Sequence, residues 1–354
     1  TLHTTYPSFA VRRVTGAGLT LNCAPHLEVI RRLAQRSTRK DVTDFILQRF
    51  GRFVARNLGQ SGADLLVGWS SVTLEAIPVA RDKGIAVVVD RGASHIGHQN
   101  KLLAAAYREL DLEFPGISQR VIEREMKEYL AADKIMVPST VAANSFVDHG
   151  IPSEKLAVVP LGVDTERFRP VGRSSRSGKP RILFVGSIGI QKGTPRLLQS
   201  FAPLSRQAEL HLVGPVEQEF TGALESLPTE GVTFRGAIAK HTMPRIYTEA
   251  DIFCLPSVHE GFGMVVLEAM AAGLPVVVSD QVGAADVISN GESGYVFPVA
   301  SGGALTEILA ELIGNAKLRQ KIGQTARQVA EGRENTWDGY VDRVIPVLSS
   351  VAHR

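Results

Sequence analysis

The sequence predicts an α/β protein made of two Rossmann-like, doubly wound parallel-sheet domains. Short apolar runs rich in β-branched residues alternate with longer amphipathic stretches, as in parallel sheets whose two faces are covered by helices. A polar segment rich in Pro, Gly and Ser interrupts this alternation at 168–180, after which it restarts. The length of 354 residues also fits two domains of about 100–200 residues each.

The first half of the chain contains four short apolar runs bounded by turn residues, and we expect each to be a buried strand. These runs cover 64–68, 85–90, 134–138 and 156–160. Helices are expected at 72–82 and 121–132, where the pattern is amphipathic. Residues 1–9 look like a later strand of such a domain, so we expect its first strand to be missing from this sequence.

The second half repeats this organisation after the linker. Strands are expected at 181–185, 209–213, 232–234, 251–255 and 274–278. Helices are expected at 194–204, 244–249, 303–330 and 337–348. We therefore divide the chain into an N-terminal domain at 1–168, a linker at 169–180, a C-terminal domain at 181–335 and a last helical segment at 336–354, which could pack back on the N-terminal domain. A cleft between two such domains is a common ligand site.

Composition and charge exclude several classes of protein. The 39 Lys and Arg against 36 Asp and Glu give a net charge of +3, too balanced for a dedicated nucleic-acid binder. The only two cysteines, Cys23 and Cys254, exclude a disulfide framework and favour the cytoplasm. No apolar run reaches the ~20 residues that span a bilayer.

The charge is nevertheless uneven along the chain. Residues 1–60 contain ten basic and three acidic residues, a charge of +7, which leaves −4 for the remainder. One interpretation is a solvated helical face without a partner. The other is peripheral contact with an anionic lipid surface at the inner face of the membrane, or with an anionic acceptor.

The most informative motif lies at 256–275, where an expected strand is followed by a glycine-flanked loop and a short helix from about 263 to 272. Gly261 and Gly263 would let the backbone approach a ligand closely. The free N–H groups and positive dipole end of the new helix would bind an anion. Glu268 lies about 7.5 Å farther along the axis and leans back toward the helix start, so it could accept hydrogen bonds from a ribose. The alternative is a tight turn with solvated Glu260 and Glu268.

A second loop, at 186–193, directly follows the first strand of the C-terminal domain. It contains three glycines and Lys192, and a lysine with exposed N–H donors suits a diphosphate. The alternative is a simple turn with a solvated lysine. Neither the dinucleotide-binding fingerprint nor the P-loop fingerprint occurs here.

At these residues the chain resembles the retaining glycosyltransferases of family 4, which have the GT-B fold. The resemblance rests on Glu260 and Glu268, seven residues apart within Glu-Gly-Phe-Gly-Met-Val-Val-Leu-Glu, and covers roughly 130–340. Further matching positions are Pro138-Ser139, 160–164, Gly186, Lys192-Gly193, Ser279-Asp280, Gly283, Gly291 and Gly294.

The resemblance implies transfer of a sugar from a nucleotide-diphosphate sugar, with retention at the anomeric carbon and with neither a metal nor a further cofactor. In that pattern Lys192 neutralises the diphosphate and Glu268 holds the ribose hydroxyls, while Glu260 lies by the donor sugar as a catalytic residue. The donor-binding loops comprise Gly186, Ser187, Gly261, Phe262, Gly263 and Met264.

The sequence departs from the family pattern at three places. Ser187 stands where the family usually has an arginine, so one positive charge near the diphosphate is lost. Asp286 replaces the more usual glutamate after Gly283. The opening strand and its glycine-rich loop look absent, which bears on whether the chain is catalytic.

The N-terminal domain must supply the acceptor side of the cleft. The strand at 85–90 runs into Arg91 and His95, which we predict to be a substrate-binding and a catalytic residue, respectively. His98 follows three residues later. The alternative is that both histidines are ordinary loop residues. Trp69, after another strand, could stack on a sugar or a lipid, and a core role is an equal alternative.

The leading hypothesis is a retaining hexosyltransferase, of a kind used in polysaccharide biosynthesis. It would use a UDP- or GDP-sugar and a glycan, lipid-linked or small-molecule acceptor. One alternative is a GT-B sugar-nucleotide hydrolase or epimerase. The other is a non-catalytic protein that binds a sugar nucleotide, which the missing first strand and Ser187 motivate.

Overall fold

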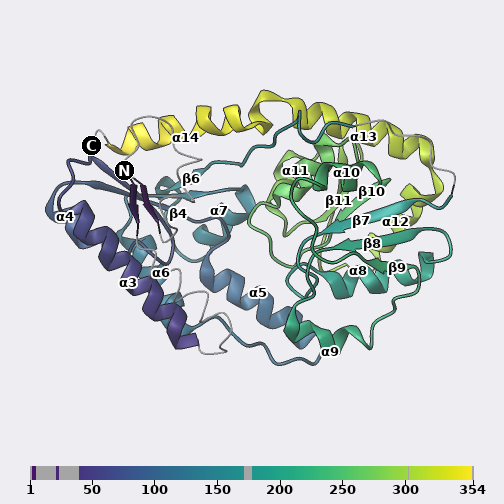
Figure 1. Cartoon of the computed structure of the whole chain (residues 1–354), viewed down its shortest axis with the longest axis horizontal. Coiled ribbons are helices and arrows are strands. Elements are labelled where there is room, and N and C mark those ends of the chain that lie inside the picture. The colour runs from purple at the N-terminus through teal and green to yellow at the C-terminus, as the bar shows by residue number, and fades with distance from the viewer. Residues whose placement is uncertain (1, 5–20, 24–39, 171–177, 302, 353–354) are drawn as a thin grey trace.

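The computed structural model describes residues 2–4, 21–23, 40–170, 178–301 and 303–352, and contains two α/β units side by side (Figure 1). Each unit is built on a parallel sheet, which confirms the fold class predicted from the sequence. The N-terminal sheet has the order β3-β4-β5-β6 and the C-terminal sheet the order β12-β11-β10-β7-β8-β9. Two further strands, β1 (Leu2–Thr4) and β2 (Leu21–Cys23), pair with each other in parallel.

The N-terminal sheet is buried under helices because its central strands are continuous β-branched runs. Its strands are β3 (Leu65–Trp69), β4 (Ala86–Asp90), β5 (Lys134–Val137) and β6 (Leu156–Val158). Its helices are α3 (Lys40–Leu58), α4 (Ile77–Asp82), α5 (Ile96–Arg108), α6 (Gln119–Ala131) and α7 (Thr140–Val147). Val87 and Val89 are fully buried on one face, whereas Val88 faces the other.

The C-terminal sheet is larger. Its strands are β7 (Arg181–Val185), β8 (Glu209–Val213), β9 (Val232–Phe234), β10 (Ile252–Leu255), β11 (Val276–Ser279) and β12 (Gly294–Phe297). Its helices are α8 (Thr194–Phe201), α9 (Thr221–Leu224), α10 (Met243–Thr248), α11 (Met264–Ala271), α12 (Ala304–Gly314) and α13 (Ala316–Glu331). The chain leaves β7 toward β8 on one side and returns at β10 on the other. This switch point is where open α/β sheets bind ligands.

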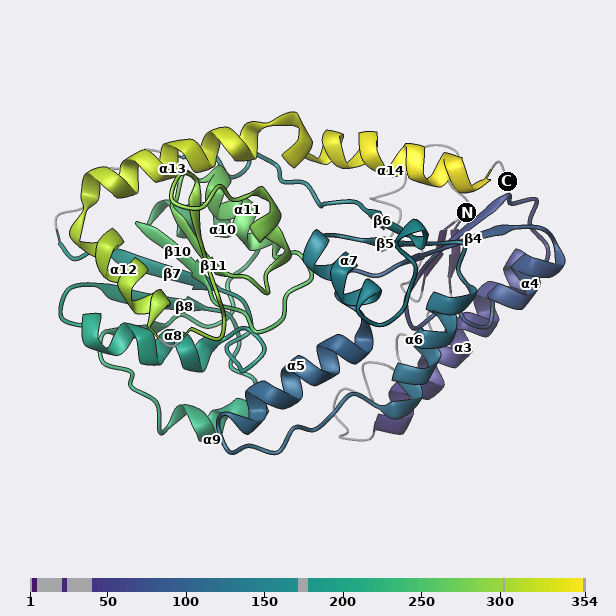
Figure 2. The same cartoon turned by 180° about the vertical axis from the view of Figure 1, so that it is seen from behind.

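Two helices join the units (Figure 2). α5 begins beside the N-terminal sheet, yet Ala106 and Tyr107 near its end pack in the core of the C-terminal unit. α14 (Trp337–Ala352) follows the C-terminal unit and returns to the N-terminal sheet, where Val351 packs with Val88 of β4. None of the helices in the described ranges is long and apolar enough to span a membrane.

Most strands occupy the expected positions within two residues, but several helices differ. The helix expected at 72–82 begins only at Ile77. Ser71 adopts a left-handed φ of 73°, so the residues after β3 form a loop instead. The single helical tail expected at 303–330 is two helices, because the Asn315 side chain accepts the N–H of Leu318 and starts a new helix. The sequence analysis gave no residue range for β2, α3, α5, α7, α9 or β12.

Parts of the sequence-based expectations lie outside the described residues. The linker at 169–180 is described only at its two ends, and most of the basic segment 1–60 is not described. The start of the N-terminal domain therefore stays a prediction. Within the described part of that segment, Arg49, Arg52 and Arg56 are exposed on α3.

Candidate active site

Two loops meet at the switch point of the C-terminal sheet, after the neighbouring strands β7 and β10. The carbonyl of Gln191 in the first loop accepts the N–H of Val258 in the second at 2.9 Å. Gly193 has a φ of 71°, and a β-carbon there would collide with the carbonyl of Pro256. The glycine is therefore needed for the close approach of the two loops.

The second loop leads into α11, whose N-cap is Gly263 with a left-handed φ of 88°. Leu267 and Met270 on this helix are fully buried, and each such side chain contributes about 1.5–3 kcal/mol. The helix is therefore fixed in place, with its positive dipole end at the loop. Phe262 points into the core, whereas Met264 is partly exposed, so only the backbone of Phe262 could meet a ligand.

Lys192 and Glu260 form an ion pair between the two loops. Both side chains are half-buried, so water screens the pair less than a surface pair. Gly186 and Ser187 open the first loop after β7. The structure thus brings together the cation, the carboxylate and the helix N-terminus that the sequence singles out. Whether they bind a substrate stays a prediction.

Glu268 lies on α11, and its carboxylate accepts a 2.7 Å hydrogen bond from the hydroxyl of Tyr247 on α10. Burial raises the pKa of Glu268, against the Tyr247 hydroxyl and the charges of Arg167 and Lys240, which lower it. Burial likewise raises the pKa of Tyr247 well above its ordinary value. The Glu268 carboxylate is therefore partly shielded from water, and the Tyr247 hydroxyl donates a hydrogen bond to it.

The two units contact each other directly at the second loop. Gly261 lies so close to Gly92 that a β-carbon at Gly261 would collide with the Gly92 carbonyl. The hydroxyl of Ser139 donates to the Gly261 carbonyl at 2.9 Å. Asp286, in η4 (Gly283–Val287), accepts both the backbone N–H and the hydroxyl of Thr140 at the start of α7. Asp286, which replaces the more usual glutamate, thus links the C-terminal unit to α7 of the N-terminal unit.

His259 lies where the two units touch, and the sequence analysis did not single it out. A 2.6 Å hydrogen bond joins its Nε2 to the hydroxyl of Ser94 across the two units, and only 4% of the residue is exposed. Burial, with the charges of Arg91, His98 and Lys192, lowers the pKa of His259 to about 3. The imidazole is therefore neutral. Its position next to Glu260 was the one available signal.

His95 lies at the start of α5, where its Nδ1 accepts the N–H of Gly97 at 3.2 Å and caps the helix. Only 2% of it is exposed. Its ring contacts those of Tyr129, Phe146 and His149, with the His149 ring centroid 4.2 Å away. Burial, together with His149, Arg91 and His98, lowers its pKa to about 4. This geometry favours a structural role for His95.

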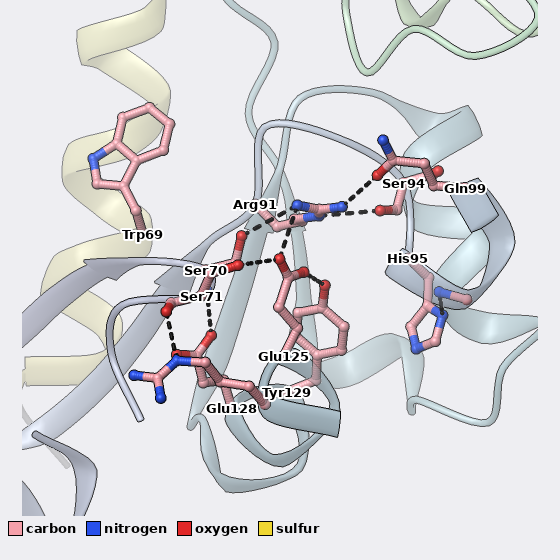
Figure 3. A network of polar contacts seen from close by, with 12 residues as sticks. Trp69, Ser70, Ser71, Arg91, Ser94, His95, Gln99, Glu125, Glu128 and Tyr129 are labelled. Atoms are coloured by element: carbon pink, nitrogen blue, oxygen red, sulfur yellow. Dashed lines mark hydrogen bonds and ion pairs between the residues drawn. The ribbon is translucent and has the colours of Figure 1, made fainter. Parts of the chain in front are cut away.

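Arg91 is the centre of a polar network at the ends of β3 and β4 (Figure 3). Its guanidinium donates to the Ser94 carbonyl at 3.2 Å and to the Gln99 side chain at 2.7 Å, and pairs with Glu125 at 3.3 Å. The His95 ring points away from this network. Trp69 also points away from it and is 67% exposed, which excludes a core role for the indole.

The part of the chain that the structure describes contains no group of three or more His, Cys, Asp or Glu residues arranged to hold a metal ion. Independence from metals and cofactors remains a prediction. Chemically, the loops after β7 and β10 offer one cation, backbone donors and two carboxylates, which suit an anionic ligand with hydroxyl groups.

The comparisons with known proteins find similarity to glycosyltransferases. Residues 166–329 match the family model described as "Glycosyl transferases group 1". The sulfoquinovosyl transferase SQD2 of Arabidopsis thaliana is 30% identical over 216 residues, 57% of this chain and 42% of that protein. The amylovoran biosynthesis glycosyltransferase AmsK of Erwinia amylovora is 30% identical over 288 residues, 74% of this chain and 69% of that protein.

Among solved structures, a sucrose-phosphate synthase from Thermosynechococcus elongatus superposes with a TM-score of 0.72 at 18% identity, covering 88% of this chain and 79% of that one. This likeness concerns the fold, and it confirms two facing Rossmann-like units. The alignments span between 42% and 58% of the lengths of three curated relatives.

Proposed function

The chain belongs to the glycosyl transferases group 1 family, and from this premise we propose that it is a hexosyltransferase with the GT-B fold. It transfers a sugar from a UDP- or GDP-sugar to a glycan, lipid-linked or small-molecule acceptor. The anomeric configuration is retained and no metal is needed. The donor binds in the C-terminal unit and the acceptor in the N-terminal unit.

The observation that carries the proposal is the convergence of Lys192, Glu260 and the N-terminus of α11 at the switch point. Negative charge builds on the diphosphate as the bond to the sugar breaks. Fixed donors at that position lower the barrier, because they need no reorganisation. Lys192 and the α11 amides supply those donors, and Glu268 accepts from the ribose hydroxyls.

Glu260 is the carboxylate that pairs with Lys192, and it lies in the loop just before α11. A bound diphosphate competes with Glu260 for Lys192, because both are anions that need the same ammonium group. Glu260 is then free to act beside the donor sugar. Ser187 lacks the usual positive charge, so donor binding relies on Lys192 and the helix N-terminus.

Product analysis tests the proposal. The protein is mixed with UDP-glucose, UDP-galactose or GDP-mannose and with methyl hexopyranosides as acceptor probes, with and without EDTA. We expect nucleotide release that needs an acceptor, and an NMR spectrum of the product that shows the anomeric configuration of the donor. Nucleotide release without an acceptor would favour a hydrolase. A product with the inverted anomeric configuration, or loss of activity with EDTA, would contradict the mechanism.

We also propose that the enzyme works in the cytoplasm, with peripheral contact at the inner face of the membrane through its basic N-terminal segment. The scarcity of cysteines and the exposed arginines of α3 support this. Co-sedimentation with vesicles that contain anionic lipid tests the contact, and equal binding to neutral vesicles would contradict it.

A further inference from the structure

Two loops of the N-terminal unit follow the neighbouring parallel strands β3 and β4 at one edge of the sheet, and both bond to side chains of α6. The first loop, 70–74, follows β3, and the second, 91–95, follows β4. The 91–95 loop contacts the loop that follows β10, through Gly92 against Gly261 and through Ser94 against His259. Neither loop has regular structure of its own, and side chains of α6 bond to both of them.

Glu125 of α6 connects both loops. It is 2% exposed, and its carboxylate accepts hydrogen bonds from the hydroxyls of Ser71 and Tyr129 and from the guanidinium of Arg91. The buried carboxylate thus neutralises Arg91 and fixes the direction of its planar donor group. Figure 3 shows Glu125 between Ser71 and Arg91.

Glu128, three residues later on the same helix, holds the first loop by its backbone. It is fully buried, and its carboxylate accepts the N–H groups of Ser71 at 2.6 Å and of Thr73 and Leu74 at 2.8 Å. These donors come from a turn in which Ser71 has a φ of 73°. The guanidinium of Arg124 on the same helix also donates to the Ser71 carbonyl at 2.5 Å. The carboxylate and this guanidinium together hold the unusual backbone in place.

Burying two carboxylates costs free energy of folding. Apolar side chains of similar volume would often make the protein equally stable or more stable. The hydrogen bonds of both carboxylates reach the two cleft loops, apart from the contact of Glu125 with Tyr129 on the same helix. Most of these hydrogen bonds therefore serve the two loops, whereas the Tyr129 contact serves the core.

We propose that Glu125 and Glu128 are positioning residues for the acceptor side of the cleft: they hold the Arg91 guanidinium and the 70–74 backbone in the geometry that receives the acceptor. This inference rests on the proposed function for the identity of the ligand, although the positioning itself does not. The residues act through Arg91 and the loop, and need not touch the substrate.

Hydrogen exchange measures the positioning directly, without activity. The full chain is compared with Glu125→Gln, Glu128→Gln and the matched control Glu123→Gln, an exposed glutamate of α6 that bonds only Gln119 among the residues described. In Glu128→Gln we expect the amides of 71–74 to exchange about tenfold faster or more. Strand β4 and the control should exchange as in the wild type. Unchanged exchange at 71–74 would overturn the proposal.

Kinetics separate positioning from simple stability. With the methyl hexopyranoside probes, Glu125→Gln should raise the KM for acceptor about tenfold or more and leave the KM for donor within twofold. Combined with Arg91→Gln, it should cost less than the sum of the two single changes, since both remove the contact between Glu125 and Arg91. Equal changes in both KM values, or additive losses, would overturn the role of Glu125.

Failure of the proposed function gives a different result. If the wild type transfers no sugar, the proposed function fails, while the exchange at 71–74 still decides whether α6 positions the cleft wall.

Discussion

Lys192 and Glu260 are the two charged residues on which the proposed donor site depends. Their ion pair spans the loops after β7 and β10, and the structure gives Lys192 no hydrogen-bond acceptor other than Glu260 among the described residues. We expect a diphosphate to displace Glu260 from Lys192, because it carries more negative charge than one carboxylate.

Replacing Lys192 by Met should lower kcat/KM for nucleotide release by about 100-fold or more, since a charge that stabilises the leaving group is lost. Lys317→Met, on the exposed side of α13, is the matched control and should behave as the wild type. Release is measured with a coupled nucleotide assay. A wild-type rate for Lys192→Met would contradict the assignment.

If Glu268 holds the ribose as proposed, we expect nucleotide binding to depend on pH. Burial raises its pKa above the ordinary 4.5, so the carboxylate is protonated earlier as the pH falls and can then no longer accept from both ribose hydroxyls. Affinity for UDP or GDP should therefore weaken on acidification, beginning above pH 4.5. Titration calorimetry from pH 8 to 5 measures this.

The variant Glu268→Gln isolates this effect. It should bind the nucleotide about tenfold more weakly at neutral pH, because hydrogen bonds to a charged acceptor are worth about 1.5–3 kcal/mol, and its affinity should lose most of the pH dependence. Equal pH dependence in both proteins would show that another group titrates.

At the scale of the elements, the junction of two loops and one short helix makes the site. α11 has only eight residues, too few to be stable alone, and its buried face holds it against the sheet. Gly193 is the point where the loops touch, because its missing side chain leaves room for the Pro256 carbonyl.

Gly193→Ala should therefore destabilise the protein by about 1–3 kcal/mol, through left-handed strain and the collision, and weaken nucleotide binding. The control is Gly222→Ala on α9, where a β-carbon meets nothing within 4 Å. Thermal unfolding and calorimetry check both. A Gly193→Ala variant as stable as the wild type would show that the loops do not need this contact.

How far the sequence predicts the elements depends on the range of the forces that form them. Strands such as 181–185 match their prediction because buried parallel strands are continuous apolar runs. The start of α4 could not be predicted, since the turn at Ser71 is held by Glu128, 57 residues away. The break at Asn315 could be recognised, because asparagine is a common N-cap.

At the scale of the whole molecule, contacts across the cleft fix how the two units face each other. His259 bonds Ser94, and His95 caps α5, whose far end packs in the other unit. In the folded protein the pKa of His259 is lowered to about 3 and that of His95 to about 4. In the unfolded chain both imidazoles bind a proton as the pH falls through about 6.5, whereas in the folded protein they stay neutral.

Stability should therefore fall as the pH drops below about 6.5, by about 1–2 kcal/mol per histidine at pH 5. The variants His259→Gln and His95→Asn, which keep hydrogen-bonding groups but do not titrate, should flatten this dependence. Chemical denaturation at pH 7, 6 and 5 measures it. A slope that is unchanged in the double variant would contradict the cause.

The candidate site was predictable where its residues follow each other in the chain. Glu260, Gly263 and Glu268 lie in one motif, and their spacing predicts a loop, a helix N-terminus and a carboxylate farther along that helix. The residues that complete the cleft from the other unit, such as Ser94 and Ser139, are brought in by tertiary packing, which no local pattern encodes. His95 was singled out by its place after a strand, but packing turned its ring toward the core.

A crystal structure of the protein with UDP or GDP would show whether the C-terminal unit binds a sugar nucleotide at the switch point of its sheet. We expect the diphosphate against Lys192 and the first amides of α11, with the ribose hydroxyls on Glu268. A nucleotide bound elsewhere, with the Lys192–Glu260 pair intact and no ligand at α11, would contradict it.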